Sequence, residues 1–277
     1  MAGFISSGNL VKDGLLRLSE AELLKATQQS YDVPSLAAWR AAELRVLRRL
    51  AFAPPLLEIG CGSGLFSSLL FQNVDCGVDR NPREIDVCSQ RTGIYRKLAC
   101  MDARSLDFPD GSFATVFANC VIEYIPGLDR VLNECRRVLW PGGRMIATVP
   151  LREMNRYLLV PLRAYAGLRA RQLQHVNLLG EREWIDAFRR AGFDDVASTP
   201  YLPGSLCRLW DRVDGPICLG AGRFTLGNLY RGSLRLLPGA ARTRIDSFWA
   251  RYFEPSLGED PSREPAAIVV EARRPVA

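Results

Sequence analysis

Short apolar segments alternate with helical segments between residues 56 and 150 of this 277-residue chain. The helical segments carry their apolar residues at a spacing of three to four. Strands that alternate with helices build βαβ units, whose strands lie parallel in a sheet that helices cover on both faces. The pattern therefore predicts an α/β fold with a doubly wound, mostly parallel sheet. The predicted strands here are residues 56–59, 76–79, 95–100, 113–119 and 144–149.

The regular alternation stops after residue 150. Residues 151–180 mix apolar residues with arginines at helical spacing, and this predicts an inserted helical lid. Residues 204–265 form a second insertion that is rich in Arg, Leu, Gly and Pro. Two further strands are predicted within 193–202 and 266–272, which brings the sheet to seven strands. We expect the insertions to form a helical cap.

The composition is that of a globular protein, with 48% hydrophobic and 24% charged residues. We interpret the net charge of +6 as a solvated basic surface rather than as a site for an acidic partner. The eight cysteines form no CxxC pair, and no apolar run reaches the roughly 20 residues that a membrane span needs. Charged residues interrupt the first thirty positions, unlike a signal peptide. We therefore expect a cytoplasmic protein with reduced thiols and no metal site.

The stretch LLEIGCGSGLF, residues 56–66, places three glycines directly behind the first predicted strand. In an open α/β sheet, ligands bind at the carboxyl ends of the strands, where this loop would lie. The nicotinamide fingerprint needs a glycine where this chain has Leu65, and the phosphate loop needs Gly-Lys-Ser or Gly-Lys-Thr where it has Gly-Leu-Phe. Glu58 would repel a pyrophosphate, so the loop favours a cofactor with positive groups.

Four more segments follow the loop in order. Asp79 ends the second strand, Asp102 follows the third, NCVIEY (119–124) ends the fourth, and RVLWPGG (137–143) is a predicted turn. With these segments the chain resembles a class I S-adenosylmethionine-dependent methyltransferase over roughly residues 50–200. It is most similar to the type 11 branch, which methylates small molecules.

The resemblance implies a Rossmann-like fold with S-adenosylmethionine as cofactor and S-adenosylhomocysteine as product. The glycine loop would approach the methionine part, Asp79 would accept from both ribose hydroxyls, and Asp102 would accept from the adenine amino group. Taken singly, both aspartates are also typical of turn caps. The cofactor-binding residues implied are Glu58, Gly60, Cys61, Gly62, Gly64, Asp79, Arg80, Met101, Asp102, Ala103 and Asn119.

The resemblance also gives the insertions a place in the domain plan. The expected plan is N-terminal helices covering the cofactor site (1–50), a cofactor-binding core (51–150), a helical lid (151–180), the end of the core sheet (181–203 and 266–277) and a substrate cap or oligomer contact (204–265). For the arginines of 152–174 we favour a solvent-facing helix over a lid at a membrane surface.

Two residues are candidates for catalysis. Methyl transfer from a sulfonium requires mainly alignment and exclusion of water, but a hydroxyl acceptor benefits from a general base. His175 is the only histidine and a candidate for that base, although it is equally compatible with packing or capping the loop. Tyr124 stands where many relatives carry histidine after glutamate, and it would hydrogen-bond the substrate or form part of the pocket wall.

The leading functional hypothesis is methylation of a small or lipid-like metabolite at oxygen. An RNA methyltransferase is the enzyme alternative, but Asn119 is not followed by the Pro-Pro-Tyr or Pro-Pro-Phe of enzymes that methylate base amino groups. A non-catalytic scaffold that binds S-adenosylmethionine is the other alternative, and the intact cofactor residues argue against it. The acceptor, the atom methylated and the oligomeric state stay open, as does peripheral contact with a membrane.

Overall fold

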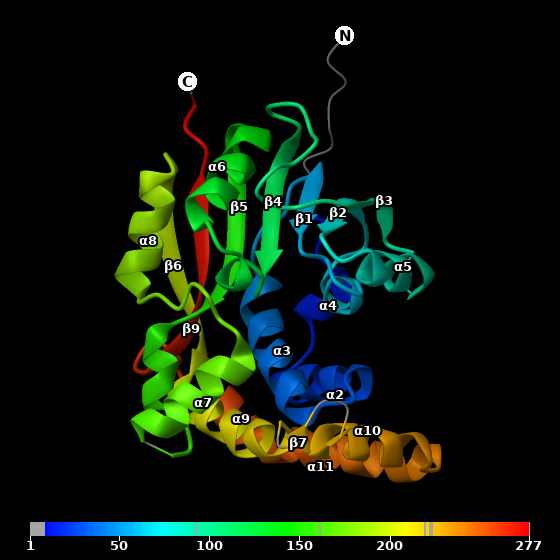
Figure 1. Ribbon diagram of the computed structural model, residues 1–277. Helices are drawn as coiled ribbons and strands as arrows, with labels where there is room; N and C mark the ends of the chain where they lie inside the picture. The colour runs from blue at the N-terminus through cyan, green and yellow to red at the C-terminus, as the bar shows by residue number, and fades with distance from the viewer. Residues whose placement is uncertain (1–8, 92, 161, 219, 222–223, 277) are drawn as a thin grey trace.

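A computed structural model describes residues 9–91, 93–160, 162–218, 220–221 and 224–276 (Figure 1). Seven strands form one sheet in the order β3-β2-β1-β4-β5-β9-β6. Neighbouring strands of this sheet run parallel, except that β9 runs antiparallel to both β5 and β6. The predicted α/β class and doubly wound, mostly parallel sheet are confirmed. The strands are β1 (Leu56–Ile59), β2 (Val74–Asp79), β3 (Tyr95–Cys100), β4 (Phe113–Asn119), β5 (Leu139–Pro150), β6 (Asp194–Pro203) and β9 (Pro265–Arg273).

Apolar layers on the two faces of the sheet explain why the central strands read as continuous apolar runs. All four residues of β1 are buried, and β4 is buried except for Ala114. On one face, Trp184 and Phe188 of α8 pack in one core with Val131 of α6. The helices flanking the sheet are α4 (Leu65–Leu70), α5 (Pro82–Arg91), α6 (Leu128–Val138) and α8 (Glu181–Arg190).

Helices from the N-terminal region lie beyond the carboxyl ends of the strands, where the arrowhead of β4 points toward α3 in Figure 1. A capping box between Ser19 and Glu22 begins the second helix. Pro34 occupies the first turn of the third helix, where its missing N–H costs nothing. These helices are α1 (Asp13–Leu16), α2 (Glu20–Ser30) and α3 (Pro34–Leu47).

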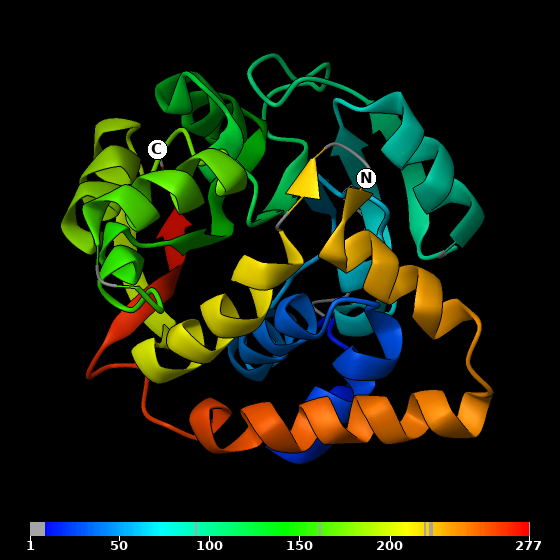
Figure 2. The same ribbon diagram turned by 60° about the horizontal axis from the view of Figure 1, so that its bottom comes forward.

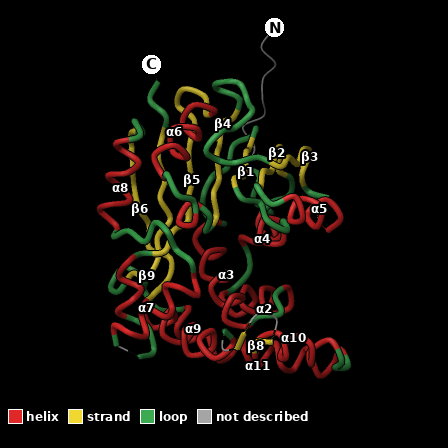
Figure 3. Tube along the Cα trace, viewed as in Figure 1, coloured by secondary structure: helices red, strands yellow, loops and turns green. Residues whose placement is uncertain are grey.

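The two insertions form a largely helical cap at the same end of the sheet (Figures 2 and 3). Arg169 joins them, because its guanidinium pairs with Asp211 at 2.7 Å and Asp214 at 2.6 Å and lies over the ring of Trp210. The cap consists of η2 (Arg152–Arg156), α7 (Arg163–Leu173), α9 (Gly204–Ile217), β7 (Gly220–Ala221), β8 (Phe224–Thr225), α10 (Leu226–Arg235) and α11 (Gly239–Leu257). None of the helices in the described part of the chain is long and apolar enough to cross a membrane.

Two local expectations differ from the structure. The Trp140–Gly143 segment was expected as a separate turn, but it lies within β5, at a register shift where Phe113 pairs with Leu139 and Thr115 with Arg144. Arg169, expected to face solvent, is 1% exposed because two aspartates of α9 neutralise it.

Candidate functional site

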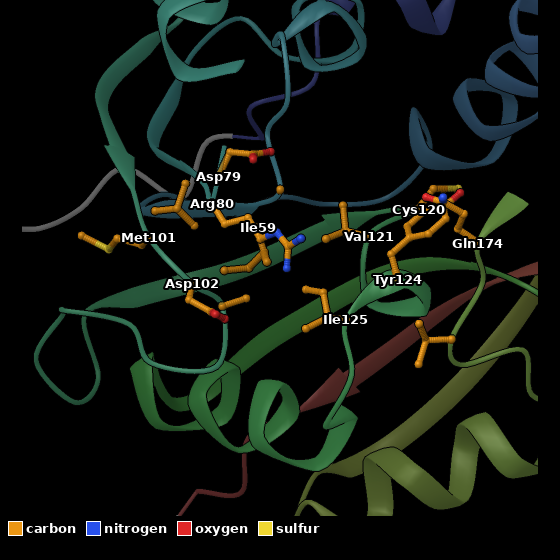
Figure 4. A pocket seen from close by; sticks show the side chains of 14 residues that line it. Ile59, Asp79, Arg80, Met101, Asp102, Cys120, Val121, Tyr124, Ile125 and Gln174 are labelled. Carbon is orange, nitrogen blue, oxygen red and sulfur yellow. The ribbon is translucent and has the colours of Figure 1, made fainter. Parts of the chain in front are cut away.

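A cavity of about 470 Å³ opens at the carboxyl ends of β1, β2 and β4, and we call it the strand-end cavity (Figure 4). This volume lies within the range of small-molecule and cofactor pockets. Figure 4 shows Asp79, Arg80, Met101 and Asp102 at one end and Cys120, Tyr124 and Gln174 at the other. Its lining residues are Ile59, Gly60, Val78, Asp79, Arg80, Met101, Asp102, Ala103, Cys120, Val121, Tyr124, Ile125, Gln174 and Val176.

Glycine is required in the loop after β1 for two different reasons. Gly60 has a φ of +67°, and a Cβ there would come within 2.5 Å of the Val121 side chain. Gly62 has a φ of +51° but open space around a Cβ, so only its backbone conformation favours glycine. The missing side chain at Gly60 lets the ends of β1 and β4 approach each other. At Gly60 the loop therefore brings backbone without a side chain to the wall of the cavity.

Asp79 is fixed by the backbone at the end of β2. Its Oδ2 accepts from the Gly62 N–H at 3.0 Å and its Oδ1 from the Asn81 N–H at 2.8 Å. A carboxylate offers about four lone-pair positions, so each oxygen keeps acceptor capacity beyond these bonds. The side chain is thus a pre-oriented double acceptor in the cavity wall, which fits two adjacent hydroxyl groups.

Asp102 is engaged by a neighbouring arginine. Arg104 donates to it from Nη2 at 2.6 Å, from Nε at 3.0 Å and from its backbone N–H at 2.9 Å. These hydrogen bonds lower the pKa of Asp102 to about 2. Asp102 is therefore a carboxylate at neutral pH, and part of its acceptor capacity is already used. Met101 and Ala103, on either side of it, also line the cavity.

Glu58 lies outside the lining of the strand-end cavity. It is 3% exposed and accepts from the Ser67 hydroxyl at 2.6 Å and the Tyr95 hydroxyl at 2.7 Å. Burial raises the pKa of Glu58 to about 7. Its contacts tie β1 to α4 and β3, so it supports the loop from behind.

Besides Glu58 and Gly62, three other predicted residues support the cavity without lining it. Asn119 accepts from the Thr148 hydroxyl at 2.7 Å, which holds the end of β4 against β5. Cys61 donates its backbone N–H to Val78 at 3.0 Å, and Gly64 caps α4 in a left-handed conformation. The predicted set thus divides into residues that face the cavity and residues that hold the loop.

A second cavity, of about 270 Å³, shares Cys120 and Tyr124 with the first, and we call it the adjoining cavity. Cys120 has a φ of +49°, a strained conformation for a non-glycine residue, at the point where β4 ends. The residues lining the adjoining cavity are Val33, Leu36, Trp39, Arg40, Cys120, Glu123, Tyr124, Pro150, Met154, Leu173, His175, Trp210, Asp214, Ile217, Cys218 and Arg231.

His175 lines the adjoining cavity and not the strand-end cavity. The centroid of its ring lies 5.1 Å from the centroid of the Tyr124 ring. The following residues, Val176 and Asn177, both donate their backbone N–H to the carbonyl of Glu123 at 2.8 Å. Burial lowers the pKa of His175 to about 4, so its imidazole is neutral at physiological pH.

Sequence reasoning missed a buried polar group contributed by α3. Glu43 is fully buried, pairs with Arg40 at 2.6 Å, and accepts from the Trp39 indole at 3.2 Å and the Tyr201 hydroxyl at 3.3 Å. Its Oε1 also accepts from the thiol of Cys120 at 2.9 Å. A charged pair at i, i+3 within an apolar helix was the available signal. This network attaches α3 to the boundary between the cavities.

Comparisons with known proteins agree with this geometry. A family model described as a methyltransferase domain (Methyltransf_11) matches residues 57–147. The chain is 34% identical over 97 residues to the sterol 4-C-methyltransferase strm-1 of Caenorhabditis elegans, an alignment covering 32% of this chain and 29% of that protein. It is 29% identical over 157 residues to the phosphatidylethanolamine N-methyltransferase of Cereibacter sphaeroides, covering 54% of this chain and 75% of the relative.

A solved structure shares the fold across nearly the whole chain. It is a SAM-dependent methyltransferase from Thermotoga maritima, titled a possible histamine N-methyltransferase, with a TM-score of 0.56, 17% identity, and coverage of 94% of this chain and 97% of that one. Together with the strand order and the glycine loop, these matches show that residues 57–147 are a class I S-adenosylmethionine-dependent methyltransferase domain, within a chain that shares the fold of such an enzyme.

Proposed function

We propose that this chain transfers a methyl group from S-adenosylmethionine to a hydroxyl oxygen of a small or lipid-like metabolite. The observation that carries the proposal is that the strand-end and adjoining cavities meet at Cys120 and Tyr124. An in-line displacement needs the methyl donor and the acceptor atom aligned across a common boundary. Two chambers with a shared wall are suited to that arrangement.

On the donor side, Asp79 would bind both ribose hydroxyls through the acceptor capacity left beyond Gly62 and Asn81. Met101 would pack on the adenine, and Asp102 would accept from the adenine amino group. When bound, the cofactor supplies an activated methyl group on a positively charged sulfur. The chain's own task is to orient the reactants and to exclude water.

On the acceptor side, the adjoining cavity combines an apolar wall with a few polar groups, as expected of a small-molecule site. Leu36, Trp39, Met154 and Trp210 provide apolar surface. Tyr124, exposed at the boundary, would hydrogen-bond or stack on the acceptor. This chamber would receive the part of the metabolite that is methylated.

A third cavity, of about 430 Å³, shares Ile217 with the adjoining cavity, and we call it the apolar cavity. It lies between α9, α10 and α11, and its wall is mostly aliphatic and aromatic. The residues that line it are Pro34, Arg212, Val213, Pro216, Ile217, Leu226, Tyr230, Phe248, Trp249 and Tyr252. Such a wall suits an alkyl chain, which supports a lipid-like acceptor.

The names of two relatives also support a lipid-like acceptor. One relative is a sterol methyltransferase, and the other is a phosphatidylethanolamine methyltransferase. Those names specify methylation at carbon and at nitrogen. They therefore support a lipid-like substrate class but not the choice of oxygen as the methylated atom. The choice of oxygen rests on the buried, titratable polar groups of the adjoining cavity, which could take up a hydroxyl proton.

The test has two stages. Calorimetric titration should show that S-adenosylmethionine binds and that Asp79→Ala loses about 1–3 kcal/mol of binding free energy, because charged hydrogen bonds disappear. Asp107→Ala, an exposed aspartate in a neighbouring loop, is the control. Transfer of labelled methyl to a lipid extract should then exceed transfer to a water-soluble extract. Equal cofactor affinity in both variants would remove Asp79 from the site, and label only in the water-soluble extract would overturn the lipid-like acceptor.

A further inference from the structure

Glu123 lines the adjoining cavity and carries a buried carboxyl oxygen without a hydrogen-bond partner among the described residues. The residue belongs to η1 (Ile122–Tyr124), the turn that directly follows β4, and it is 1% exposed. Its Oε2 is buried and has no hydrogen-bond partner among the described residues. Leaving such an atom unpaired costs stability, so a buried orphan calls for a specific reason. A polar ligand group in the cavity would supply the missing partner.

The position of Glu123 relates it to both chambers. It lines the adjoining cavity, and the next residue, Tyr124, lines both cavities. Its backbone carbonyl accepts from Val176 and Asn177, which attaches the His175 segment to the same turn. The orphan oxygen therefore belongs to a residue that lines the chamber proposed for the acceptor, and this residue is next in sequence to Tyr124 at the boundary with the proposed donor chamber.

Charged and titratable groups from several elements act on Glu123 or line the same cavity. Burial is the main cause that raises its pKa to about 8, and Glu43 of α3 raises it further. A hydrogen bond from its own backbone N–H, the charge of Arg40 of α3 and a hydrogen bond with Cys120 act in the opposite direction. From the cap side the cavity includes Asp214, paired with Arg169, and Arg231, which bonds Asn228. Tyr124 and the neutral imidazole of His175 also line this cavity.

His175 is a weaker candidate for the same task. Its Nδ1 is also buried without a partner in the described structure. A base works best when its pKa lies near the operating pH, because it must take a proton and then hold it. Burial holds the pKa of His175 near 4, so an imidazolium formed there would be too acidic to retain a proton.

We propose that Glu123, and not His175, is the catalytic base that accepts the proton of a hydroxyl acceptor during methyl transfer. This inference rests on the proposed function. The hydroxyl oxygen forms the new bond to the methyl carbon, the electrons of the carbon–sulfur bond stay on sulfur, and the hydroxyl proton passes to Oε2 of Glu123. No further oxidant or co-reactant is required.

The protonation state can be measured in the protein without cofactor. Infrared difference spectra should show the carbonyl stretch of a protonated, buried carboxyl group that disappears as the pH rises through about 8. Glu123→Gln should lack this band. Glu58→Gln is the matched control, because it should remove a separate band that titrates near 7. A wild-type spectrum without a Glu123-dependent band above pH 6 would overturn the proposal.

The single histidine allows a parallel measurement. Its imidazole resonances in a proton NMR titration need no assignment by mutation, since the chain has no other histidine. We expect a pKa near 4. A measured value near 6.5, the ordinary value, would restore His175 as the better base and contradict the assignment to Glu123.

A hydroxyl probe connects the carboxyl group to the acceptor. With S-adenosylhomocysteine present, 4-hexylphenol should shift the Glu123 band, whereas its methyl ether 4-hexylanisole, which has no hydroxyl proton, should not. Equal shifts, or no shift with either probe, would count against Glu123.

Catalysis gives the last comparison. With a hydroxyl acceptor from the lipid-extract screen, turnover should rise with pH through about 8, because only the carboxylate accepts a proton. Glu123→Gln should lower turnover on the order of 10² to 10⁴-fold with unchanged cofactor affinity, and His175→Asn far less. The reverse ranking would overturn the proposal. Failure of the protein to bind S-adenosylmethionine would instead overturn the proposed function, and the two failures are thus distinguishable.

Discussion

The strand-end cavity and the adjoining cavity share a wall, yet they are assembled in different ways. The first is lined mainly by residues that directly follow β1, β2, β3 and β4, so short stretches of sequence place them. The second combines residues of α3, η1, η2 and α9, which are distant in the chain. The donor side therefore depends on local turns, whereas the acceptor side depends on how the cap packs.

The largest expected effect is in the cap. Arg169→Ala removes the cation from two aspartates, of which Asp211 is fully buried, and should cost about 3–5 kcal/mol of unfolding free energy. Arg163→Ala, at an exposed position of the same helix, should cost little. Urea unfolding followed by tryptophan fluorescence makes the comparison. If the donor side does not depend on how the cap packs, the folded Arg169→Ala variant should keep the cofactor affinity of the wild type. A large loss of that affinity would contradict the distinction between the two sides.

A second effect concerns the support of the donor side. The folded-state pKa of Glu58 is about 7, above its ordinary 4.5, so between these values the folded protein binds more protons than the unfolded chain. Stability from this group is therefore present below pH 4.5 and is lost as the pH rises to about 7.

Glu58→Gln should remove that loss, which corresponds to about 3 kcal/mol. The measurement is the unfolding free energy of the variant minus that of the wild type at pH 5 and at pH 8, since the difference cancels the other titrating groups. Glu254→Gln, at an exposed position, is the control. The same difference at both pH values would contradict the raised pKa.

The glycine loop allows a sharper test with two neighbouring positions. Alanine at either Gly60 or Gly62 meets a left-handed backbone, but only at Gly60 does the new Cβ collide with Val121. Gly60→Ala should therefore lose about 1–3 kcal/mol more stability than Gly62→Ala. Thermal or urea unfolding of both variants measures the difference. Equal losses would mean that the ends of β1 and β4 separate easily.

The smallest effect is expected in the apolar cavity. Phe248→Ala changes a side chain that is 59% exposed, so stability should change by no more than about 0.5 kcal/mol. The preference for 4-hexylphenol over phenol should nevertheless fall about fivefold, because the alkyl chain loses apolar contact. Calorimetry measures the ratio of affinities, with Leu236→Ala, 87% exposed and outside the cavities, as control. An unchanged ratio would separate this cavity from the acceptor.

The sheet and most of the strand-end cavity could be predicted because their signals are local. Where glycines or an aspartate follow an apolar strand, they lie at the carboxyl edge of the sheet, and distant segments are not needed to place them there. The Trp140–Gly143 segment was harder, because it lies within β5 at the register shift between Leu139 and Arg144. Pairing with a partner strand decides where such a strand begins, and the sequence of one segment carries no information about that pairing.

The adjoining cavity could be predicted only in part. His175 was recognised as a residue of the pocket region, but its low pKa results from burial against segments far away in the sequence. Glu123 stood within a recognised segment, yet nothing local indicates that α3 and the residues after α7 would bury it. Arg169 likewise reads as one surface arginine among several until α9 supplies two aspartates. Tertiary packing, rather than residue type, determined the properties of these groups.

The position of the antiparallel strand β9 determines the order in which the sheet can form during translation. It lies between β5 and β6, and in the part of the chain that the structure describes β6 pairs with no other strand. A ribosome therefore releases β6 and the whole of α9 to α11 before β9 exists to pair with them. Until then β6 has no partner and the edge of β5 stays open, a state that invites association with other chains. The sheet that the structure describes is thus completed only when β9, which follows the cap in the sequence, has been translated.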